Sequence, residues 1–154
     1  MTDIDLLRGL APDEAARVLA LGERVELGAG EELFHLGDSA ESIYLVVLGH
    51  LRLTLPMQVR NHEEDVLVEE RSSGQTVGWS ALIPPYRFTL TAIAPVDAEV
   101  IALSREALNA YFEEHPATGY AVSLNVSCVI GHRLQLFQAM WLREVQRMVE
   151  LRCA

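Results

Sequence analysis

The sequence predicts a mainly β protein with flanking helices: a jelly-roll-like β-roll (a double-stranded β-helix) followed by one long C-terminal helix. In the middle of the chain, short runs of β-branched, aromatic and alternating apolar residues are separated by glycine and proline, as in sandwiches, barrels and rolls. From residue 117 to residue 153 there is no proline, and apolar residues recur every three or four positions, which indicates an amphipathic helix.

The composition indicates one folded domain, and its charge and apolar content argue against nucleic acid and membrane as partners. The 154 residues are 50% hydrophobic and 22% charged, which is typical of a globular domain. A net charge of -10 disfavours nucleic acid, because a phosphate backbone attracts basic surfaces. Cys128 and Cys153 make no disulfide framework, the acidic start Met1–Asp5 is no signal peptide, and no apolar run could span a bilayer. We therefore expect a cytoplasmic protein that contacts neither nucleic acid nor membrane.

The elements are expected in the following order. Ile4–Leu21 shows helical spacing of leucines, with Pro12 where a first turn tolerates it. Pro56 is expected to end a strand, residues 61–65 to form a polar hairpin tip, and Trp79–Leu82 to make one helical turn. The expected strands are Glu31–Leu36, Ser42–Leu48, His50–Leu55, Val66–Glu70, Phe88–Ala94 and Ala98–Leu103.

Helix returns after the strands. Ser104 is a good N-cap for a helix running to His115, and Pro116 interrupts it. We divide the chain into residues 1–116, the β-roll with its N-terminal helices, and residues 117–154, a dimerisation helix of the same domain. Gly131 is expected to mark a kink or a close helix contact.

The long helix carries an apolar seam with two interpretations. The seam could be an internal core stripe or a dimer coiled coil. A helix of about 35 residues is roughly 50 Å long, which is more than a small roll can cover. An uncovered end would leave an apolar patch, so we predict a parallel homodimer. The seam residues are Leu134, Phe137, Trp141, Val145 and Met148.

Other polar groupings carry weaker signals. Cys128 and His132 share a helix face and could reach a metal or haem, but without further ligands a buried thiol and a surface imidazole are favoured. Residues 62–65 could bind a divalent cation, but a solvated hairpin tip is favoured. No nucleophile elbow, zinc spacing or P-loop is present, so we expect no enzyme, no metal and no resident cofactor.

The order of segments resembles the cyclic nucleotide-binding domain of catabolite-activator-type regulators, gated channels and kinase regulatory subunits. The resemblance covers about Ile4 to Cys153. Its landmarks are Gly30–Phe34 with Gly37-Asp38, Tyr44–Val46 with Gly49, Gly74-Gln75 with Val77-Gly78, Ala81-Leu82, and Ala94 with Ala98–Val100.

This resemblance implies a phosphate-binding cassette whose two key residues are replaced. The family places a glutamate after the second glycine to accept the ribose hydroxyl, and an arginine at the next strand to pair with the cyclic phosphate. Trp79 and Phe88 stand at those positions, and Arg87 lies one residue before the second, where a one-residue slip reverses the side chain.

Two functions follow as expectations. In the first, the domain is a regulatory sensor in which a small molecule other than cyclic AMP shifts the long helix. In the second, it is a dimeric interaction scaffold with a filled pseudo-site. Since catabolite-activator regulators continue into a helix-turn-helix beyond the position of Ala154, we expect no conventional DNA-binding regulator and consider action through a protein partner. The candidate pocket residues are Gly78, Trp79, Ser80, Ala81, Arg87, Phe88, Thr89 and Thr91, with Arg133, Phe137 and Gln138 as a lid from the helix.

Overall fold

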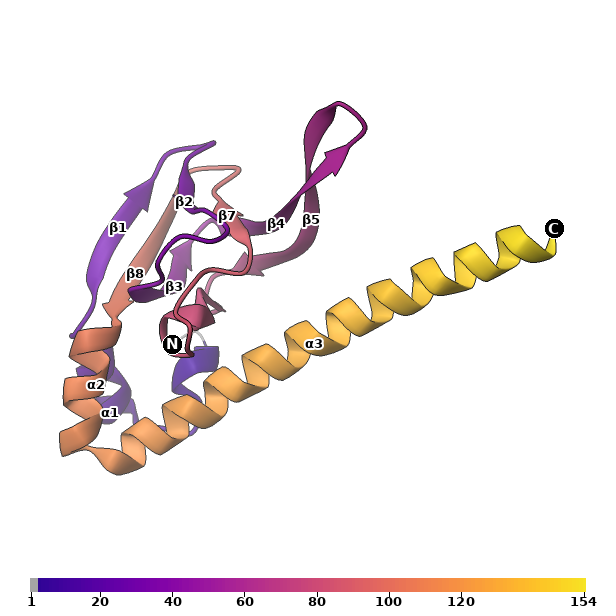
Figure 1. The fold of residues 1–154 in the computed structure, drawn as a ribbon. Coiled ribbons are helices and arrows are strands. Elements are labelled where there is room, and N and C mark those ends of the chain that lie inside the picture. The colour runs from indigo at the N-terminus through magenta and orange to yellow at the C-terminus, as the bar shows by residue number, and fades with distance from the viewer. Residues whose placement is uncertain (1–2) are drawn as a thin grey trace.

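A computed structural model describes residues 3–154 of the chain, so Met1 and Thr2 of the acidic start lie outside the described residues. Two four-stranded antiparallel sheets form a β-roll, with short helices at one end and a long helix that leaves the roll (Figure 1). The predicted fold class, a mainly β roll with flanking helices and a long C-terminal helix, is confirmed.

The two sheets enclose the core. Val46 and Val100 from the first sheet and Leu51 and Leu53 from the second are almost completely buried. The first sheet has the order β1 (Glu23–Leu27), β8 (Ala98–Ser104), β3 (Ser42–Leu48) and β6 (Thr76–Val77). The second has the order β2 (Glu32–Phe34), β7 (Thr91–Ile93), β4 (His50–Val59) and β5 (His62–Ser72).

The β4–β5 hairpin is longer than the sequence predicts. Pro56 does not end β4, which continues to Val59, and the turn lies at residues 60–61 rather than over 61–65. β7 pairs with β4 only over Arg52–Thr54, so Pro56 lies where β4 has a single neighbour. Proline is tolerated on such an edge because no second strand needs its missing N–H group.

Two further strands differ from expectation. β1 is absent from the predicted elements because Leu27 is its only buried residue. The strand predicted over Phe88–Ala94 is reduced to the three residues of β7. The backbone of Phe88 instead pairs with the preceding loop: its N–H group donates to the Asp38 carbonyl (3.0 Å), and its carbonyl accepts from Gly37 (2.8 Å).

The helices occur where the sequence places them. Ser104 caps the penultimate helix by accepting a hydrogen bond from the Ala107 N–H group at 3.1 Å. No helix within residues 3–154 is long and apolar enough to cross a membrane. The helices are η1 (Asp5–Leu7), α1 (Pro12–Leu19), η2 (Trp79–Ala81), α2 (Arg105–Glu114) and α3 (Pro116–Cys153).

Helix α3 packs on the domain through its first half and Leu136, and the residues beyond project away from the roll (Figure 1). A Cβ at Gly131 would meet nothing within 4 Å, and the helix continues through it, so this glycine marks no close contact. The close contact is at Gly119, where a Cβ would lie 2.9 Å from Cβ of Phe112 in α2. Gly119 therefore sets how closely α2 and α3 approach.

These two glycines give a matched prediction. Gly131→Ala should raise the free energy of unfolding by about 0.5–1 kcal/mol, because alanine favours helix and the site is open. Gly119→Ala should lower it by about 1–3 kcal/mol, because the added methyl group overpacks the α2–α3 contact. Urea unfolding followed by circular dichroism measures both, and equal effects of the two substitutions would contradict the packing described.

Glu14 joins the three helices at the base of the roll. Its Oε1 accepts hydrogen bonds from the Thr118 hydroxyl in α3 (2.6 Å) and the Tyr111 hydroxyl in α2 (2.8 Å), while Oε2 accepts from Nε of Arg17 (3.0 Å). The bond from Thr118, then those from Tyr111 and Arg17, lower the pKa of Glu14 from 4.5 to about 2. The ionised carboxylate therefore holds α1, α2 and α3 together.

The lowered pKa predicts a pH dependence. Because the folded pKa lies below the unfolded value, the stabilisation by ionised Glu14 is fully present above pH 4.5 and is lost as the pH falls towards 2. Wild type should be more stable than Glu14→Gln at pH 6, and the difference should shrink between pH 4.5 and 2. Urea unfolding of both proteins across this range measures the difference. A difference independent of pH would show that the carboxylate charge is not what matters.

Candidate functional site

The cassette lies between β6 and the loop before β7. Gly78 has a φ of 79°, in the left-handed region, and turns the chain from β6 into η2. A Cβ at this position would lie 3.1 Å from Cε1 of Phe88 and 3.3 Å from Cδ2 of Tyr44. A glycine is therefore required here both by backbone conformation and by the aromatic rings packed against it.

Aromatic side chains occupy the space in front of the cassette. The rings of Phe34 and Phe88 stack with centroids 3.7 Å apart and planes 8° from parallel, and Phe34 also contacts Tyr44, at 5.9 Å. The remaining cavity has a volume of about 10 Å³, which is barely room for one water molecule. It is lined by Phe34, Leu53, Gly78, Trp79, Ser80, Phe88, Thr89, Leu90 and Arg133.

The structure brings together six of the predicted pocket residues: Gly78, Trp79, Ser80, Phe88, Thr89 and Arg133. The other five do not line this cavity. Phe137 and Gln138 lie on the exposed part of α3, beyond Arg133. Ala81 is fully buried, and its carbonyl accepts a hydrogen bond from Nη1 of Arg105 at 3.1 Å.

Arg87 and Thr91 are used elsewhere. Arg87 is exposed, and its Nη1 donates to the Gly37 carbonyl at 2.9 Å, so its guanidinium braces the early loop rather than entering the cavity. This is the outcome expected when a side chain is one residue out of register with Phe88. The buried hydroxyl of Thr91 accepts a hydrogen bond from the Leu36 N–H group at 3.0 Å.

Several residues that shape the site were not predicted. Phe34, Leu53 and Leu90 line the cavity, and only the apolar character of their segments hinted at burial. Arg105 of α2 supports the cassette loop from behind: its Nη1 donates to the Ala40 carbonyl at 2.9 Å, and its guanidinium lies 3.9 Å from the centroid of Tyr86. No sequence signal identifies these contacts, because they join segments far apart in the chain.

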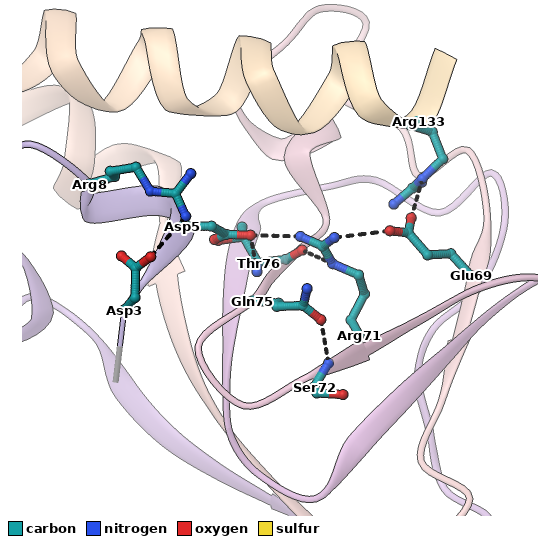
Figure 2. A network of polar contacts seen from close by, with 9 residues as sticks. All are labelled: Asp3, Asp5, Arg8, Glu69, Arg71, Ser72, Gln75, Thr76 and Arg133. Atoms are coloured by element: carbon teal, nitrogen blue, oxygen red, sulfur yellow. Dashed lines mark hydrogen bonds and ion pairs between the residues drawn. The ribbon is translucent and has the colours of Figure 1, made fainter. Parts of the chain in front are cut away.

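A charged network lies beside the cassette and was also not predicted (Figure 2). The Arg71 side chain, only 8% exposed, donates to the Thr76 carbonyl (3.0 Å), to Oε1 of Glu69 (3.0 Å) and to Oδ2 of Asp5 (2.7 Å). Asp5 also accepts from the Thr76 N–H group, at 3.1 Å, and from the Thr76 hydroxyl. Arg71 therefore ties η1, β5 and β6 together.

Glu69 extends this network to α3. Its Oε2 accepts a hydrogen bond from Nε of Arg133 at 2.8 Å, so one carboxylate pairs with two arginines (Figure 2). Burial lowers the pKa of Arg133, and the charge of Glu69 opposes that shift. Arg133 also lines the cassette cavity, so it is the residue that connects the cavity, the hairpin and the long helix.

The remaining polar candidates stay apart. Cys128 is exposed, which corrects the expectation of a buried thiol. Within residues 3–154, no three histidine, cysteine or acidic side chains gather as a metal-binding group. A larger cavity, of about 490 Å³, lies at the ends of β1 and β8, where Glu26, Glu31, Asp97 and Glu99 are among its lining residues. Four carboxylates make this cavity repulsive to a phosphate.

Known proteins share the fold of this chain. The family model of the cyclic nucleotide-binding domain matches residues 24–115. The catabolite activator protein of Thermus thermophilus has a similar structure, with a TM-score of 0.74 and 26% identity, covering 92% of this chain and 63% of that one. The cyclic AMP receptor protein of the same organism is 27% identical over 132 residues, which are 84% of this chain and 57% of that protein.

The domain also occurs within a much larger enzyme. A lysophospholipase of Aspergillus oryzae is 29% identical over 113 residues, which are 73% of this chain but only 7% of that protein. The chain thus spans a small part of the lysophospholipases and little more than half of the Thermus receptor protein. With the β-roll, the cassette turn and the family match together, this chain belongs to the cyclic nucleotide-binding domain family.

Proposed function

We propose that this domain is a non-catalytic, dimeric regulatory scaffold in which aromatic side chains fill the nucleotide site. The observation that carries the proposal is the Phe34–Phe88 stack in front of the cassette. Ligand pockets generally measure about 300–1,000 Å³, whereas the cavity here has a volume of about 10 Å³. A nucleotide could enter only by separating the stacked rings.

Electrostatics supports the same proposal. A buried phosphate needs charge-assisted partners, most often arginine. Phe88 occupies the family's arginine position, and Arg87 points its guanidinium at the Gly37 carbonyl. Arg133 is the remaining guanidinium at the cavity, and its Nε is engaged by Glu69. A phosphate could therefore bind only if the Phe34–Phe88 stack separated and the Arg133–Glu69 ion pair were disturbed.

The long helix supplies the surface for dimerisation. Of the predicted seam, Leu134 is 68%, Trp141 64% and Met148 52% exposed. Leu142 and Val149 are also exposed and lie beside them, so the apolar face covers an arc of roughly 140° at 100° per residue. The centre of this face lies about 110° around the helix from Val122 and Val126, which pack on the roll, and Phe137 stands at the border between the two faces. A second copy of α3, running parallel, is the partner we propose for it.

A second candidate function is a sensor for a small molecule other than a cyclic nucleotide. It is favoured by the polar groups that remain around the cavity, namely the hydroxyls of Ser80 and Thr89 and the guanidinium of Arg133. In this case the ligand would displace Phe88 and reach Arg133, shifting α3. In both cases we propose that the output passes to a protein partner, without nucleic acid or membrane contact, in the cytoplasm.

The first test is nucleotide binding. The melting temperature of the wild-type protein should not change with millimolar cyclic AMP, cyclic GMP or cyclic di-GMP, because the stacked rings exclude them. A ligand present at 100 times its dissociation constant adds about 2.7 kcal/mol, which is about 5–10 °C for a domain of this size. Differential scanning fluorimetry detects such a shift, and one of this size with any of the three would overturn the scaffold proposal.

A matched variant shows whether the two replaced residues are responsible. Trp79→Glu with Phe88→Arg restores the family's residue types and removes one ring of the stack. This double variant should gain a melting shift with cyclic AMP that the wild type lacks. If the double variant folds and still shows none, then isothermal titration of Phe88→Ala with cyclic AMP separates steric exclusion from the missing charges.

The second test is the oligomeric state. The wild-type protein should sediment as a dimer of the 17.1 kDa chain. Trp141→Glu should weaken the dimer at least about 30-fold, since a central tryptophan contributes 2 kcal/mol or more to many interfaces. Analytical ultracentrifugation over a concentration series measures the dissociation constant.

Ala139→Glu is the control for this substitution. Ala139 is exposed and lies two residues before Trp141, on the other side of α3 from the apolar face. The variant introduces the same glutamate away from that face, so the dimer should be unchanged. A monomeric wild type, or equal weakening by both substitutions, would contradict dimerisation through the proposed face.

A further inference from the structure

The contact between Glu69 and Arg133 differs from the rest of the charged network. Asp5, Glu69 and Arg71 all belong to the body of the domain, and Arg133 alone comes from α3 (Figure 2). Two positive and two negative charges meet here, so the network as a whole is neutral. The single bond from Nε of Arg133 to Oε2 of Glu69 is its only link to the long helix within residues 3–154.

This link can break without stranding a buried charge. If Arg133 leaves, Glu69 keeps its ion pair with Nη1 of Arg71 at 3.0 Å. Arg71 in turn keeps Asp5 and the Thr76 carbonyl. Breaking a buried ion pair costs most free energy when one charge is left without a partner. Here both remaining acids, Asp5 and Glu69, keep Arg71 as their partner. The Arg133 side chain is only 8% exposed while it is paired, so opening the contact requires α3 to carry its guanidinium out to water.

Arg133 lies where α3 leaves the domain, so its contact can determine the direction of the projecting part of the helix. The helix is anchored near its start by Thr118 on Glu14, and in its third turn by Asn125, whose Nδ2 donates to the carbonyls of Leu6 (2.8 Å) and Arg8 (2.9 Å). Arg133 is the last residue of α3 with a hydrogen bond to the body of the domain, among the residues described. Residues 134–153 then extend about 30 Å without a further polar contact to it.

A glycine with greater backbone freedom lies just before this contact. Gly131 lies two residues before Arg133, in open space, where no neighbouring atom requires a glycine. A glycine inside a helix allows more backbone freedom than any other residue. The helix is therefore anchored up to Ile130, which packs against the core, loosened at Gly131, and held again by the ion pair of Arg133 and by the partly buried Leu136.

We infer that the Arg133–Glu69 ion pair is a releasable latch that sets the direction of the projecting half of α3. Opening the latch lets the helix pivot near Gly131, and a rotation of about 10° moves its end by about 5 Å over the 30 Å arm. The apolar face of α3 then changes its position relative to the hairpin. The inference rests on the proposed function only in assigning that face to a partner.

Spin-label distances test the latch. Cys153 at the end of α3 and an introduced Glu63→Cys on the hairpin are labelled in a Cys128→Ser background, and labelled protein is diluted with unlabelled protein to suppress distances between protomers. Double electron–electron resonance should give a broader or shifted distance distribution for Arg133→Gln and for Glu69→Gln than for the latched protein. Arg133→Lys keeps the charge, so its distance distribution should lie between that of the latched protein and that of Arg133→Gln.

Thr76→Val is the control within the same network. It removes the hydroxyl bond to Asp5 and leaves Arg133 and Glu69 intact, so the distance distribution should match that of the latched protein even if the melting temperature falls. Arg133→Gln should show the reverse, a changed distribution with a melting temperature within a few degrees of wild type.

Two results would overturn the latch. One is an unchanged distribution in Arg133→Gln and Glu69→Gln; the other is an equal change in Thr76→Val. Sedimentation of the same samples keeps this outcome separate from the proposed function: a dimer with unchanged distances rejects the latch alone, and a monomer with changed distances rejects the dimer alone.

Discussion

The buried guanidinium of Arg71 is the constraint around which the domain is organised. A charge that is only 8% exposed must be neutralised, and Asp5, Glu69 and the Thr76 carbonyl do so from three separate segments. Satisfying this one group fixes η1 against β6 and orients the end of β5. Because Glu69 has a second oxygen, the same solution also positions Arg133 and with it α3. One shared carboxylate thus links the hairpin strand β5 to α3.

In the scaffold that we propose, the side chains around the cassette turn serve packing. Gly78 makes the left-handed turn into η2, and the rings of Phe88, Tyr44 and Phe34 pack against it. Aromatic area gives large burial energy without the desolvation cost of a phosphate and its partners.

Sequence patterns predicted some of these features well and others poorly. The β-branched and aromatic run of Ser42–Leu48 and the cap at Ser104 gave correct elements because both signals are local. The prediction that Pro56 ends a strand was wrong. The effect of this proline depends on whether β7 reaches that part of β4, which is a property of the sheet and not of the residue. Gly131 misled likewise, because only the neighbours in space show that Gly119 is the glycine under steric demand.

The sequence by itself determined the fold class and the long helix with its apolar face, and its resemblance to the family implies that Trp79 and Phe88 replace two family residues. These features follow from periodicity and from residue types, which are local properties of the sequence. Only the tertiary structure decided that Phe34 meets Phe88, that Arg87 turns away, and that Asp5, Glu69, Arg71 and Arg133 form one network. Such contacts join residues separated by 50 or more positions in most cases, and their pairing depends on the geometry of the packed sheets and helices.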